Sequence, residues 1–469
     1  MNLLEANGKA VHLVGIGGVG MTALAWYLND LGWIVSGSDA QNFRMRALLE
    51  ARGVKVQVPP DPIFLCQTDL LIYSSAIPQE HPELTKARQN HVPLLERMEA
   101  IHLILNKKRL VGITGSYGKS TTTTFVSSMM HRSGMEPDWL IGADLLSYPP
   151  ARCANSPWMV LECDESKSKF LDLCPENLLI CNVGRDHLQE YDHSMQKLAD
   201  AFARLSMQVP PKGCIVLNGD DELLASTIQK QSCRATVITC GFKQECDFSL
   251  SQIQTEWTGK SFITRFELTS PEGKKIQACI PMPGWQNALD ALMAYALIYF
   301  HSNKLPDVDL FSCLPVMDRR MEVKVNYKQF LLLDDEGDSP DVIEWALKAV
   351  RNYFPTKKII SVVQAHRYTR LKNLYQEYAR VLSQCSSDII LLPVYAAGEV
   401  PLEGVNADNL AKQIMGLGFK GSIHLAENHS DAVSILQSEL DKDSLAITLG
   451  PGDVWKVGDL LSDDLKTYS

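Results

Sequence analysis

The sequence predicts an α/β protein of three domains, in which mainly parallel β-sheets carry helices on both faces. A chain of 469 residues is too long to fold around one hydrophobic core. Short apolar runs typical of buried strands alternate with helical periodicity along the chain, which favours parallel sheets. Glycine-rich turns follow two of these runs and precede helices, as in nucleotide-binding folds. We expect Rossmann-like first and third domains and a central domain of the P-loop ATPase type.

The first domain, residues 1–107, opens with the elements of a Rossmann-like unit. The strand KAVHLVG runs into the turn GIGGVG, and the periodic stretch MTALAWYLNDLG then predicts a helix. A second strand, WIVSGSD, ends at Asp39. Gly15, Gly17 and Gly20 fit the spacing G-x-G-x-x-G, and Asp39 lies about 20 residues further on, where a ribose ligand is expected. DLLIYSSAI predicts a further buried strand.

The second domain, residues 108–314, alternates strands and helices. Its expected strands are RLVGITG, WMVLECD, NLLICNVG, GCIVLNGD and TVITCGF. Its expected helices include STTTTFVSSMMHRSG, KLADAFARL and the apolar, buried stretch ALDALMAYALIYF. This alternation predicts a mainly parallel sheet with helices on both faces.

The third domain, residues 315–469, repeats this pattern. Its expected strands are QFLLLDDE, KKIISVVQAH, DIILLPVY and SLAITLG, with helices between them. Ser339 and Pro340 predict a helix start, with serine at the N-cap and proline at the first helical position.

Composition excludes several classes of protein. The chain is 45% hydrophobic and 21% charged, which is ordinary for a soluble globular protein. It has no apolar run near the ~20 residues that cross a bilayer, and its N-terminus lacks the basic stretch of a signal peptide. A net charge of −10 argues against binding nucleic acid. Its 12 cysteines include no C-x-x-C pair, so we expect reduced core thiols and a cytoplasmic protein without a membrane partner.

A second glycine-rich turn, LVGITGSYGKSTTTTF, predicts a phosphate-binding loop. The usual pattern G-x-x-x-x-G-K-[ST] would place its first glycine where this chain has Ile113. The turn nevertheless follows a strand and opens a helix rich in hydroxyl groups, so backbone N–H groups can hold phosphate oxygens. Lys119 can then approach the β- and γ-phosphates, and the Ser120 hydroxyl can bind Mg²⁺.

Acidic and imidazole side chains follow two other predicted strands of this domain. Glu162 and Asp164 end one strand, and Asp186 and His187 follow the next. Because ligands bind outside the carboxyl ends of parallel strands, these side chains can converge near the phosphate loop. Carboxylates beside a triphosphate commonly hold Mg²⁺, and the imidazole can hold a second ion or orient a substrate group.

These motifs together resemble the Mur ligase family. The family patterns are T-G-x-x-G-K-[ST], then E-x-D, then N-x-x-x-D-H, and its phosphate loop needs no glycine at the position of Ile113. The resemblance continues in order through HLVGIGGVGMTALA, GSD, SSAIPQEHPEL, PGWQN, MDRRME, QAHRYTR, VYAAGE and LGPGDVWKVG. It therefore covers nearly the whole chain.

The resemblance implies an ATP-dependent amide ligase of peptidoglycan precursor synthesis. In this family ATP phosphorylates a carboxylate of a UDP-linked muramic acid, and an amine then displaces phosphate from the acyl phosphate. The N-terminal motifs are most similar to the branch that adds the first amino acid to UDP-N-acetylmuramate. The implied cofactors are ATP and Mg²⁺. The implied partners are a UDP-N-acetylmuramate-like donor and a small amino acid, and the implied assembly is a monomer or homodimer.

The resemblance also implies roles for individual residues. Those expected at ATP are Thr114, Gly115, Ser116, Tyr117, Gly118, Lys119, Ser120, Thr121, Asn287, Arg320 and Asp335. Those expected at the UDP-sugar are Gly15, Gly17, Gly18, Gly20, Met21, Asp39, Ser74, Ser75 and Ala76. Lys119, His187, Arg367 and Arg370 are expected to be catalytic, and Ser120, Glu162 and His187 to bind Mg²⁺. Glu336, Asp338, His366, Arg367 and Arg370 are expected at the acceptor amino acid.

The acceptor loop departs from the family pattern. Glu336 stands where the alanine-adding enzymes have a tyrosine, and Asp338 stands where they have a histidine. Two carboxylates beside the incoming amino acid would favour a cationic acceptor, or repel a substrate carboxylate unless an arginine or metal intervenes.

Three other functions stay open at this point. One is a paralogue that joins a different acid and amine outside cell-wall synthesis. Another is a degenerate copy that binds nucleotide without chemistry. The last is an NAD-dependent oxidoreductase, which GIGGVG and Asp39 alone support and which leaves the second phosphate loop unexplained.

Overall fold

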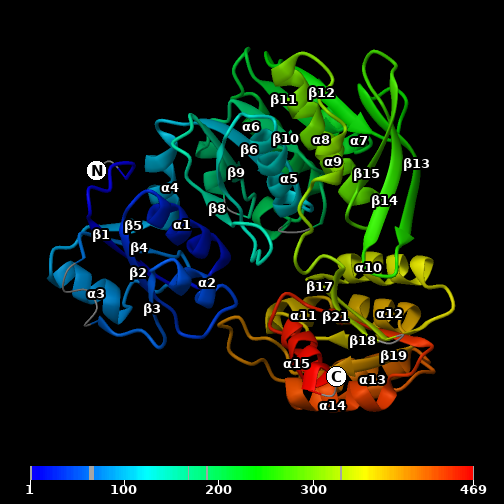
Figure 1. The fold of residues 1–469 in the computed structure, drawn as a ribbon. Helices are drawn as coiled ribbons and strands as arrows, with labels where there is room; N and C mark the ends of the chain where they lie inside the picture. The colour runs from blue at the N-terminus through cyan, green and yellow to red at the C-terminus, as the bar shows by residue number, and fades with distance from the viewer. Residues whose placement is uncertain (1–2, 63–67, 167, 186–187, 328–329, 468–469) are drawn as a thin grey trace. The chain divides into compact units, whose positions relative to one another are not determined.

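The computed structural model describes residues 3–62, 68–166, 168–185, 188–327 and 330–467. The chain forms two compact units. The first comprises Met1–Gln254, Thr264–Pro281 and Trp285–Pro315, and the second comprises Thr255–Ile263, Met282–Gly284 and Val316–Ser469. Figure 1 labels the elements of both units and colours them in chain order.

The N-terminal part of the first unit forms a five-stranded parallel sheet. Its strand order is β3-β2-β1-β4-β5. The strands are β1 (Ala10–Val14), β2 (Ile34–Ser38), β3 (Lys55–Gln57), β4 (Leu70–Tyr73) and β5 (Leu94–Glu96). The helices are α1 (Val19–Asp30), α2 (Arg46–Ala51), α3 (Pro82–Gln89) and α4 (Arg97–Leu105). The central strand β1 is buried on both faces, which explains its uninterrupted apolar run.

A ten-stranded sheet follows, in the order β15-β14-β13-β12-β11-β10-β6-β9-β7-β8. The strands from β13 to β7 in that order pair in parallel, whereas β8 and β15 pair antiparallel with their neighbours. The strands are β6 (Arg109–Thr114), β7 (Asp138–Leu140), β8 (Ala151–Arg152), β9 (Trp158–Glu162), β10 (Asn177–Ile180), β11 (Cys214–Asn218), β12 (Thr236–Gly241), β13 (Phe248–Trp257), β14 (Phe262–Thr269) and β15 (Lys275–Ile280).

Helices cover this sheet as the sequence predicts. They are α5 (Lys119–Arg132), α6 (Met195–Ser206), α7 (Glu222–Gln229), α8 (Trp285–Ser302) and α9 (Asp309–Ser312), with short 3₁₀ helices at Ser168–Asp172 and Leu188–Tyr191. Helices α5 and α8 pack side by side (Figure 1). The middle of α8, residues 288–298, is buried, as its apolar sequence predicts.

The second unit contains a six-stranded sheet, in the order β16-β17-β21-β18-β19-β20. Only β16, at the edge, pairs antiparallel with its neighbour among these described strands. The strands are β16 (Glu322–Tyr327), β17 (Phe330–Asp335), β18 (Lys358–Val363), β19 (Asp388–Leu391), β20 (Ile423–Leu425) and β21 (Ser444–Leu449). The helices are α10 (Pro340–Tyr353), α11 (Tyr368–Asn373), α12 (Tyr375–Cys385), α13 (Ala407–Gly416), α14 (His429–Glu439) and α15 (Trp455–Thr467).

The predicted fold class is confirmed, with several local differences. The antiparallel pair β14–β15 at the edge of the ten-stranded sheet was not predicted. Ser339 does precede α10, but its hydroxyl is buried and makes no cap hydrogen bond to any described residue. Each of the three predicted domains contains one sheet, and their boundaries stay predictions. Among the helices described, none combines the length and apolar character that crossing a membrane requires.

Candidate active site

Two glycines give the loop between β6 and α5 its shape. Gly115 and Gly118 have φ angles of +133° and +84°, which residues with a Cβ rarely adopt. A Cβ on Gly115 would also lie 3.0 Å from the backbone nitrogen of Asn182. Ile113, by contrast, is a fully buried residue of β6. The loop therefore needs glycine at 115 and 118 but not at 113, which accounts for its unusual spacing.

A side chain that follows β10 clamps this loop. The Asn182 amide accepts a hydrogen bond from the Tyr117 N–H and donates one to the Tyr117 carbonyl, both at 2.9 Å. The N–H of Gly184 donates to Ser116 Oγ at 2.7 Å. The sequence motif contains Asn182 without giving it a role, and these contacts make it a positioning residue for the phosphate loop.

Helix α5 presents its N-terminus to the loop. Its N-cap is Gly118, so no side chain caps the first backbone N–H groups. Those groups and the positive end of the helix dipole favour an anion. The neighbouring threonines face inward, since Thr121 is 5% exposed and the Thr114 hydroxyl donates to the Cys163 carbonyl at 2.8 Å. The loop thus offers its backbone, more than its hydroxyls, to a phosphate group.

The Lys119 ammonium lies inside this loop, beside a buried carboxylate. Its Nζ donates to the carbonyl oxygens of Gly115 at 2.7 Å and Ser116 at 3.3 Å, and it pairs with Glu165 at 2.9 Å. Burial lowers the pKa of Lys119, but Glu165 and Asp164 outweigh it, and the net shift of the pKa is upward. Lys119 is therefore cationic, and Glu165 is its counter-ion. Sequence reasoning missed Glu165, although the acidic run ECDE contains it.

Ser120 and Glu162 come together beside Lys119. Burial raises the pKa of Glu162, and a hydrogen bond with Ser120 opposes that shift. The carboxylate also accepts a hydrogen bond from the Gly142 N–H, at 3.1 Å. A hydroxyl and a carboxylate are hard oxygen donors, which suit Mg²⁺. The described residues hold no group of three or more His, Cys, Asp and Glu that could bind a metal, and the predicted ligand His187 lies outside them, as does Asp186.

The first glycine loop lies between β1 and α1. Gly15 has φ of +78°, and the N–H of Gly17 donates to Asp39 at 2.9 Å. Asp39, expected at a ribose, thus also holds this loop in place. Met21 is buried in α1. The remaining predicted donor-site residues lie in two places. Gly18 is the N-cap of α1 and Gly20 lies in its first turn, whereas Ser74, Ser75 and Ala76 follow β4, which pairs in parallel with β1.

Arg97, the first residue of α4, lies against the first glycine loop. A Cβ on Gly20 would meet the Arg97 Nη1 atom at 2.5 Å. Burial lowers the pKa of Arg97, while the charges of Asp164 and Glu162 oppose that shift. Arg97 therefore lies near both the first glycine loop and the carboxylates of the phosphate site, all within the first unit. No sequence motif singled it out, because its neighbours are far away along the chain.

The second unit contains the other predicted ATP residues. Asp335, at the end of β17, accepts hydrogen bonds from the N–H groups of Met321 and Gly337, both at 3.0 Å. Burial raises its pKa to about 6. Arg320 pairs with Glu336 at 3.5 Å. Asn287 lies in the first unit, in the first turn of α8, so the predicted ATP set is divided between the units.

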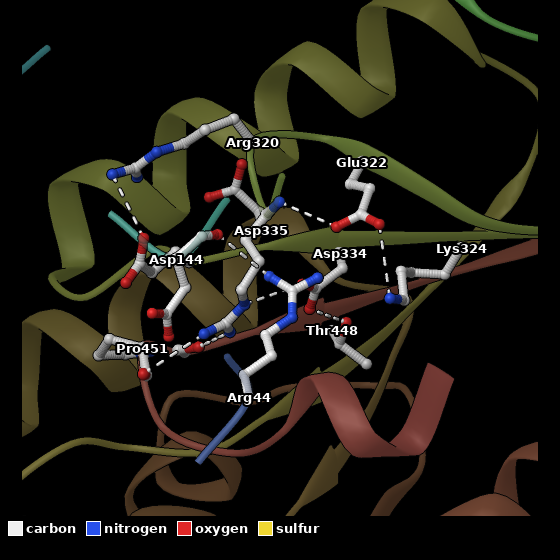
Figure 2. Close-up of polar contacts among 12 residues, drawn as sticks. Arg44, Asp144, Arg320, Glu322, Lys324, Asp334, Asp335, Thr448 and Pro451 are labelled. Carbon is white, nitrogen blue, oxygen red and sulfur yellow. Dashed lines mark hydrogen bonds and ion pairs between the residues drawn. The ribbon is translucent and has the colours of Figure 1, made fainter. Parts of the chain in front are cut away.

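Arg319, beside Arg320, has a structural role. It is 5% exposed and pairs with the fully buried Asp334 at 3.0 Å. Its guanidinium also donates to the carbonyl oxygens of Gly450, Pro451 and Gly452. Figure 2 labels Asp334, Thr448 and Pro451 in a close-up of polar contacts. Arg319 therefore fixes the loop after β21.

The predicted acceptor residues gather after β17 and β18. Arg370 donates to the side chain of Asp338 at 2.8 Å and to its carbonyl at 2.9 Å. Burial, with Arg370 and Arg367 nearby, lowers the pKa of His366 to about 4. Its Nδ1 atom is buried and bonds to no described residue. Arg367 has φ of +66°, an uncommon backbone conformation for a residue with a Cβ.

Comparisons with known proteins match nearly the whole chain. Residues 10–109 match the model described as "Mur ligase family, catalytic domain", residues 113–298 the Mur ligase middle domain, and residues 319–452 the model described as "Mur ligase, glutamate ligase domain". The UDP-N-acetylmuramate–L-alanine ligase of Desulfosudis oleivorans is 32% identical over 463 residues, covering 97% of this chain and 98% of that protein. The chain belongs to the Mur ligase family.

Other members of the Mur ligase family are similar too. The ligase of the same name from Dictyoglomus turgidum is 32% identical over 97% of both chains. The crystal structure of UDP-N-acetylmuramate-alanine ligase from Thermotoga maritima matches with a TM-score of 0.82, at 22% identity, covering 98% of this chain and all of that one. The family and the fold predicted from the sequence are therefore confirmed, whereas the roles of individual site residues stay predictions.

Proposed function

We propose that this chain is the ATP-dependent ligase that joins L-alanine to the carboxylate of UDP-N-acetylmuramate in peptidoglycan precursor synthesis. The full-length relatives that carry this name support the substrates. The observation that carries the chemistry is the cationic Lys119 in a glycine loop at the start of α5, beside Ser120 and Glu162. Its cytoplasmic location and its assembly as monomer or homodimer stay predictions.

The first step forms an acyl phosphate. A carboxylate oxygen of the donor attacks the γ-phosphorus of ATP, the bond to ADP breaks, and negative charge spreads over the transferring group. Lys119 and the N–H groups of the loop offset that charge. Mg²⁺, held by Ser120 and Glu162, would neutralise the phosphates further. Glu165 keeps the Lys119 ammonium charged and in place until phosphate oxygens take its position.

The second step forms the amide. The neutral amine of alanine attacks the acyl carbon, the bond to phosphate breaks, and the nitrogen loses one proton to the released phosphate or to water. Holding the amine at the acyl carbon supplies much of the rate. We assign Arg370 and Arg367 to the substrate carboxylate, which a guanidinium can hold with two hydrogen bonds. A pKa near 4 keeps His366 neutral, so it suits accepting a hydrogen bond from the amino group rather than removing its proton.

In the donor site, we assign Arg97 to an anionic group of the UDP-sugar. The guanidinium lies close to Gly20, and the charges of Asp164 and Glu162 act on it. A diphosphate at that loop would give it a partner and bring the rest of the donor toward the phosphate site. Asp39 and the turn at Ser74–Ala76 would complete the donor site.

The acidic acceptor loop does not favour a cationic acceptor. Asp338 is paired with Arg370, and Glu336 is paired with Arg320, so each added carboxylate faces an arginine. The alternative of a paralogue with a cationic substrate is therefore not favoured.

Phosphate release from ATP, with Mg²⁺, UDP-N-acetylmuramate and each amino acid singly, tests the proposal. We expect release with L-alanine and none when the donor is omitted. Lys119→Ala should abolish it, since the variant lacks the charge at the phosphates.

Release with a cationic amino acid alone would contradict the assignment of L-alanine. ATP binding without phosphate release for any amine would indicate a non-catalytic protein. A rise in unfolding temperature on addition of NAD would support the alternative of an NAD-dependent oxidoreductase.

A further inference from the structure

The segment 394–399, VYAAGE in the sequence, follows β19 and pairs with the segment that follows β18. The Tyr395 N–H donates to the Ala365 carbonyl at 2.9 Å, and the Arg367 N–H donates to the Tyr395 carbonyl at 2.8 Å. These bonds form a parallel bridge between Tyr395 and His366. Since β18 and β19 are parallel neighbours, the bridge extends their pairing past the carboxyl ends of both strands. The segment therefore lies against the predicted acceptor residues, within the second unit.

The ring of Tyr395 stacks on the imidazole of His366. The ring centroids are 5.6 Å apart and the ring planes meet at 13°. The stack restricts rotation of the imidazole, because a turned ring would lose this contact or collide with Tyr395. The Nδ1 atom of His366 is buried and bonds to no described residue. Tyr395 thus holds an unused hydrogen-bonding atom in one orientation.

Glu399, at the other end of the segment, caps α11. Its carboxylate accepts hydrogen bonds from the Thr369 N–H at 3.0 Å and from the Thr369 hydroxyl at 2.6 Å. The N-cap residue is Arg367, whose side chain makes no cap hydrogen bond and has no acceptor atom. Glu399 therefore satisfies an N–H group that the first turn of the helix leaves open. Burial raises the pKa of Glu399, but the bonds from Thr369 and the charge of Arg367 outweigh it, and the net shift of the pKa is downward.

The capped stretch carries two arginines that are expected at the acceptor. Arg370 is the third residue of α11, and Arg367 stands immediately before the helix. Arg367 has φ of +66° and ψ of 134°, which a residue with a Cβ rarely adopts. Such a backbone persists only where its surroundings hold it. The bond to the Tyr395 carbonyl holds Arg367 on one side, and Glu399, bonded two residues further along the chain, holds it on the other.

We propose that Tyr395 and Glu399 are positioning residues for the acceptor amino acid. Tyr395 orients the imidazole of His366, and Glu399 fixes the stretch that carries Arg367 and Arg370. This inference rests on the proposed function, because it assumes that these side chains hold L-alanine. Groups that are already fixed in the binding geometry lose little freedom when the ligand arrives, so their affinity for it is higher. The segment 394–399 would therefore set the KM for the amino acid without touching it.

The kinetics of phosphate release, with each of the three substrates varied in turn, test the role of Glu399. Glu399→Ala should raise the KM for L-alanine roughly 5-fold, which corresponds to the loss of one helix cap, and leave the KM for ATP and for UDP-N-acetylmuramate unchanged. Glu399→Gln should retain most of the affinity, because its amide oxygen can still accept the Thr369 N–H. The matched control is Glu403→Ala, which removes an exposed carboxylate of the same loop and should change none of the three KM values.

Two variants of Tyr395 test the stack. Tyr395→Ala should lower kcat/KM for L-alanine roughly 5-fold, whereas Tyr395→Phe keeps the ring and should stay close to the original value. The pKa of His366, followed by NMR, gives a second readout. Because burial is the largest cause of its lowered value, the pKa should rise from about 4 in Tyr395→Ala and stay unchanged in Tyr395→Phe.

Several results would overturn the inference and leave the proposed function intact. One is an equal rise of all three KM values in Glu399→Ala, because the segment would then only support the fold. Another is an unchanged KM for L-alanine in that variant. An equal loss in Tyr395→Ala and Tyr395→Phe would assign the effect to the hydroxyl and not to the stack.

A further variant keeps the test decisive if Glu399→Ala does not fold. Thr369→Val removes only the hydroxyl bond to Glu399 and should still raise the KM for L-alanine alone. An unchanged KM for L-alanine in this variant would overturn the inference too. Phosphate release by the unaltered protein without L-alanine would contradict the proposed function, and the inference with it.

Discussion

Lys119 and Glu165 form an ion pair 2.9 Å long inside the phosphate loop, with the carboxylate fully buried. The pair explains how the loop keeps an ammonium group charged without a nucleotide. In the proposed function, phosphate oxygens would take the place of Glu165 at Lys119, so the carboxylate and the phosphates would compete for one cation.

Removal of the counter-ion should make the protein depend on nucleotide for stability. We expect Glu165→Gln to lower the free energy of unfolding by roughly 2–3 kcal/mol, because Lys119 is left without its charged partner. Saturating ATP should narrow the difference between variant and unaltered protein, since phosphates restore the negative charge. Urea denaturation with and without an ATP analogue measures this. A difference that the analogue leaves unchanged would contradict competition at Lys119.

A matched control removes an exposed ion pair of the same unit. Glu222 pairs with Lys243 at 3.3 Å and its side chain is 87% exposed. Glu222→Gln should change the stability little, with or without nucleotide.

Arg319 and Arg320 are neighbours in the sequence, but we expect Arg319 to affect stability and Arg320 to affect ATP binding. Arg319→Met leaves Asp334 buried without its ion pair, so we expect the free energy of unfolding to fall by about 3–5 kcal/mol. Arg320 is one-third exposed and its partner Glu336 is too. Arg320→Met should therefore unfold like the original protein but raise the KM for ATP. Equal losses of stability in the two variants would contradict this division of roles.

Asp338 should weaken the hold of Arg370 on the substrate. The carboxylate occupies the guanidinium, while the Asp338 carbonyl also fixes it at 2.9 Å. Asp338→Ala keeps the contact between its carbonyl and Arg370 but removes the carboxylate. The Arg370 guanidinium is then available to the substrate carboxylate, so we expect the KM for L-alanine to fall several-fold. Amino-acid titrations of phosphate release measure it. A rise in KM would show instead that the carboxylate positions Arg370. Glu344→Gln, which alters the Arg380 pair at 2.8 Å, is the control.

Asp335 should give stability a distinct pH dependence. Burial raises its pKa from 3.8 to about 6, so the folded state binds a proton more tightly than the unfolded state. Its contribution is fully present at low pH and is lost as pH rises from about 4 through about 6, by roughly 3 kcal/mol. Asp335→Asn should remove this pH dependence of the free energy of unfolding. The substitution can also change the free energy by an amount that is the same at every pH. Denaturation of both proteins from pH 4 to pH 7 tests this expectation. If the free energy of unfolding changes with pH in the same way in both proteins, Asp335 is not the cause of the loss.

The phosphate loop and the three sheets could be predicted because their signals are local. Strand, glycine turn and helix follow one another in the sequence. The T-G-x-x-G-K-S spacing also places glycine at 115 and 118, the two positions where the loop needs a positive φ. The positions of Glu162 and Ser120 also follow from strand ends in a parallel sheet.

Partners that come from distant parts of the chain could not be predicted. Arg97 and Asn182 acquire their roles only when separate strands place them against the glycine loops. Likewise, the charges of Glu336 and Asp338 suggest a cationic substrate when only the sequence is considered. In the structure, Glu336 pairs with Arg320 and Asp338 pairs with Arg370. The Ser339 hydroxyl, expected as a cap, is buried away from such a bond because tertiary packing overrides the local preference.

The proposed reaction phosphorylates the carboxylate of UDP-N-acetylmuramate and then joins it to L-alanine. Its most direct test is mass spectrometry of the phosphate released when the donor carboxylate carries oxygen-18. We expect phosphate release to require L-alanine. The released phosphate should contain one oxygen from the donor, because the bridging oxygen of an acyl phosphate leaves with the phosphate. Amide formation with unlabelled phosphate, or release that ignores L-alanine, would contradict it.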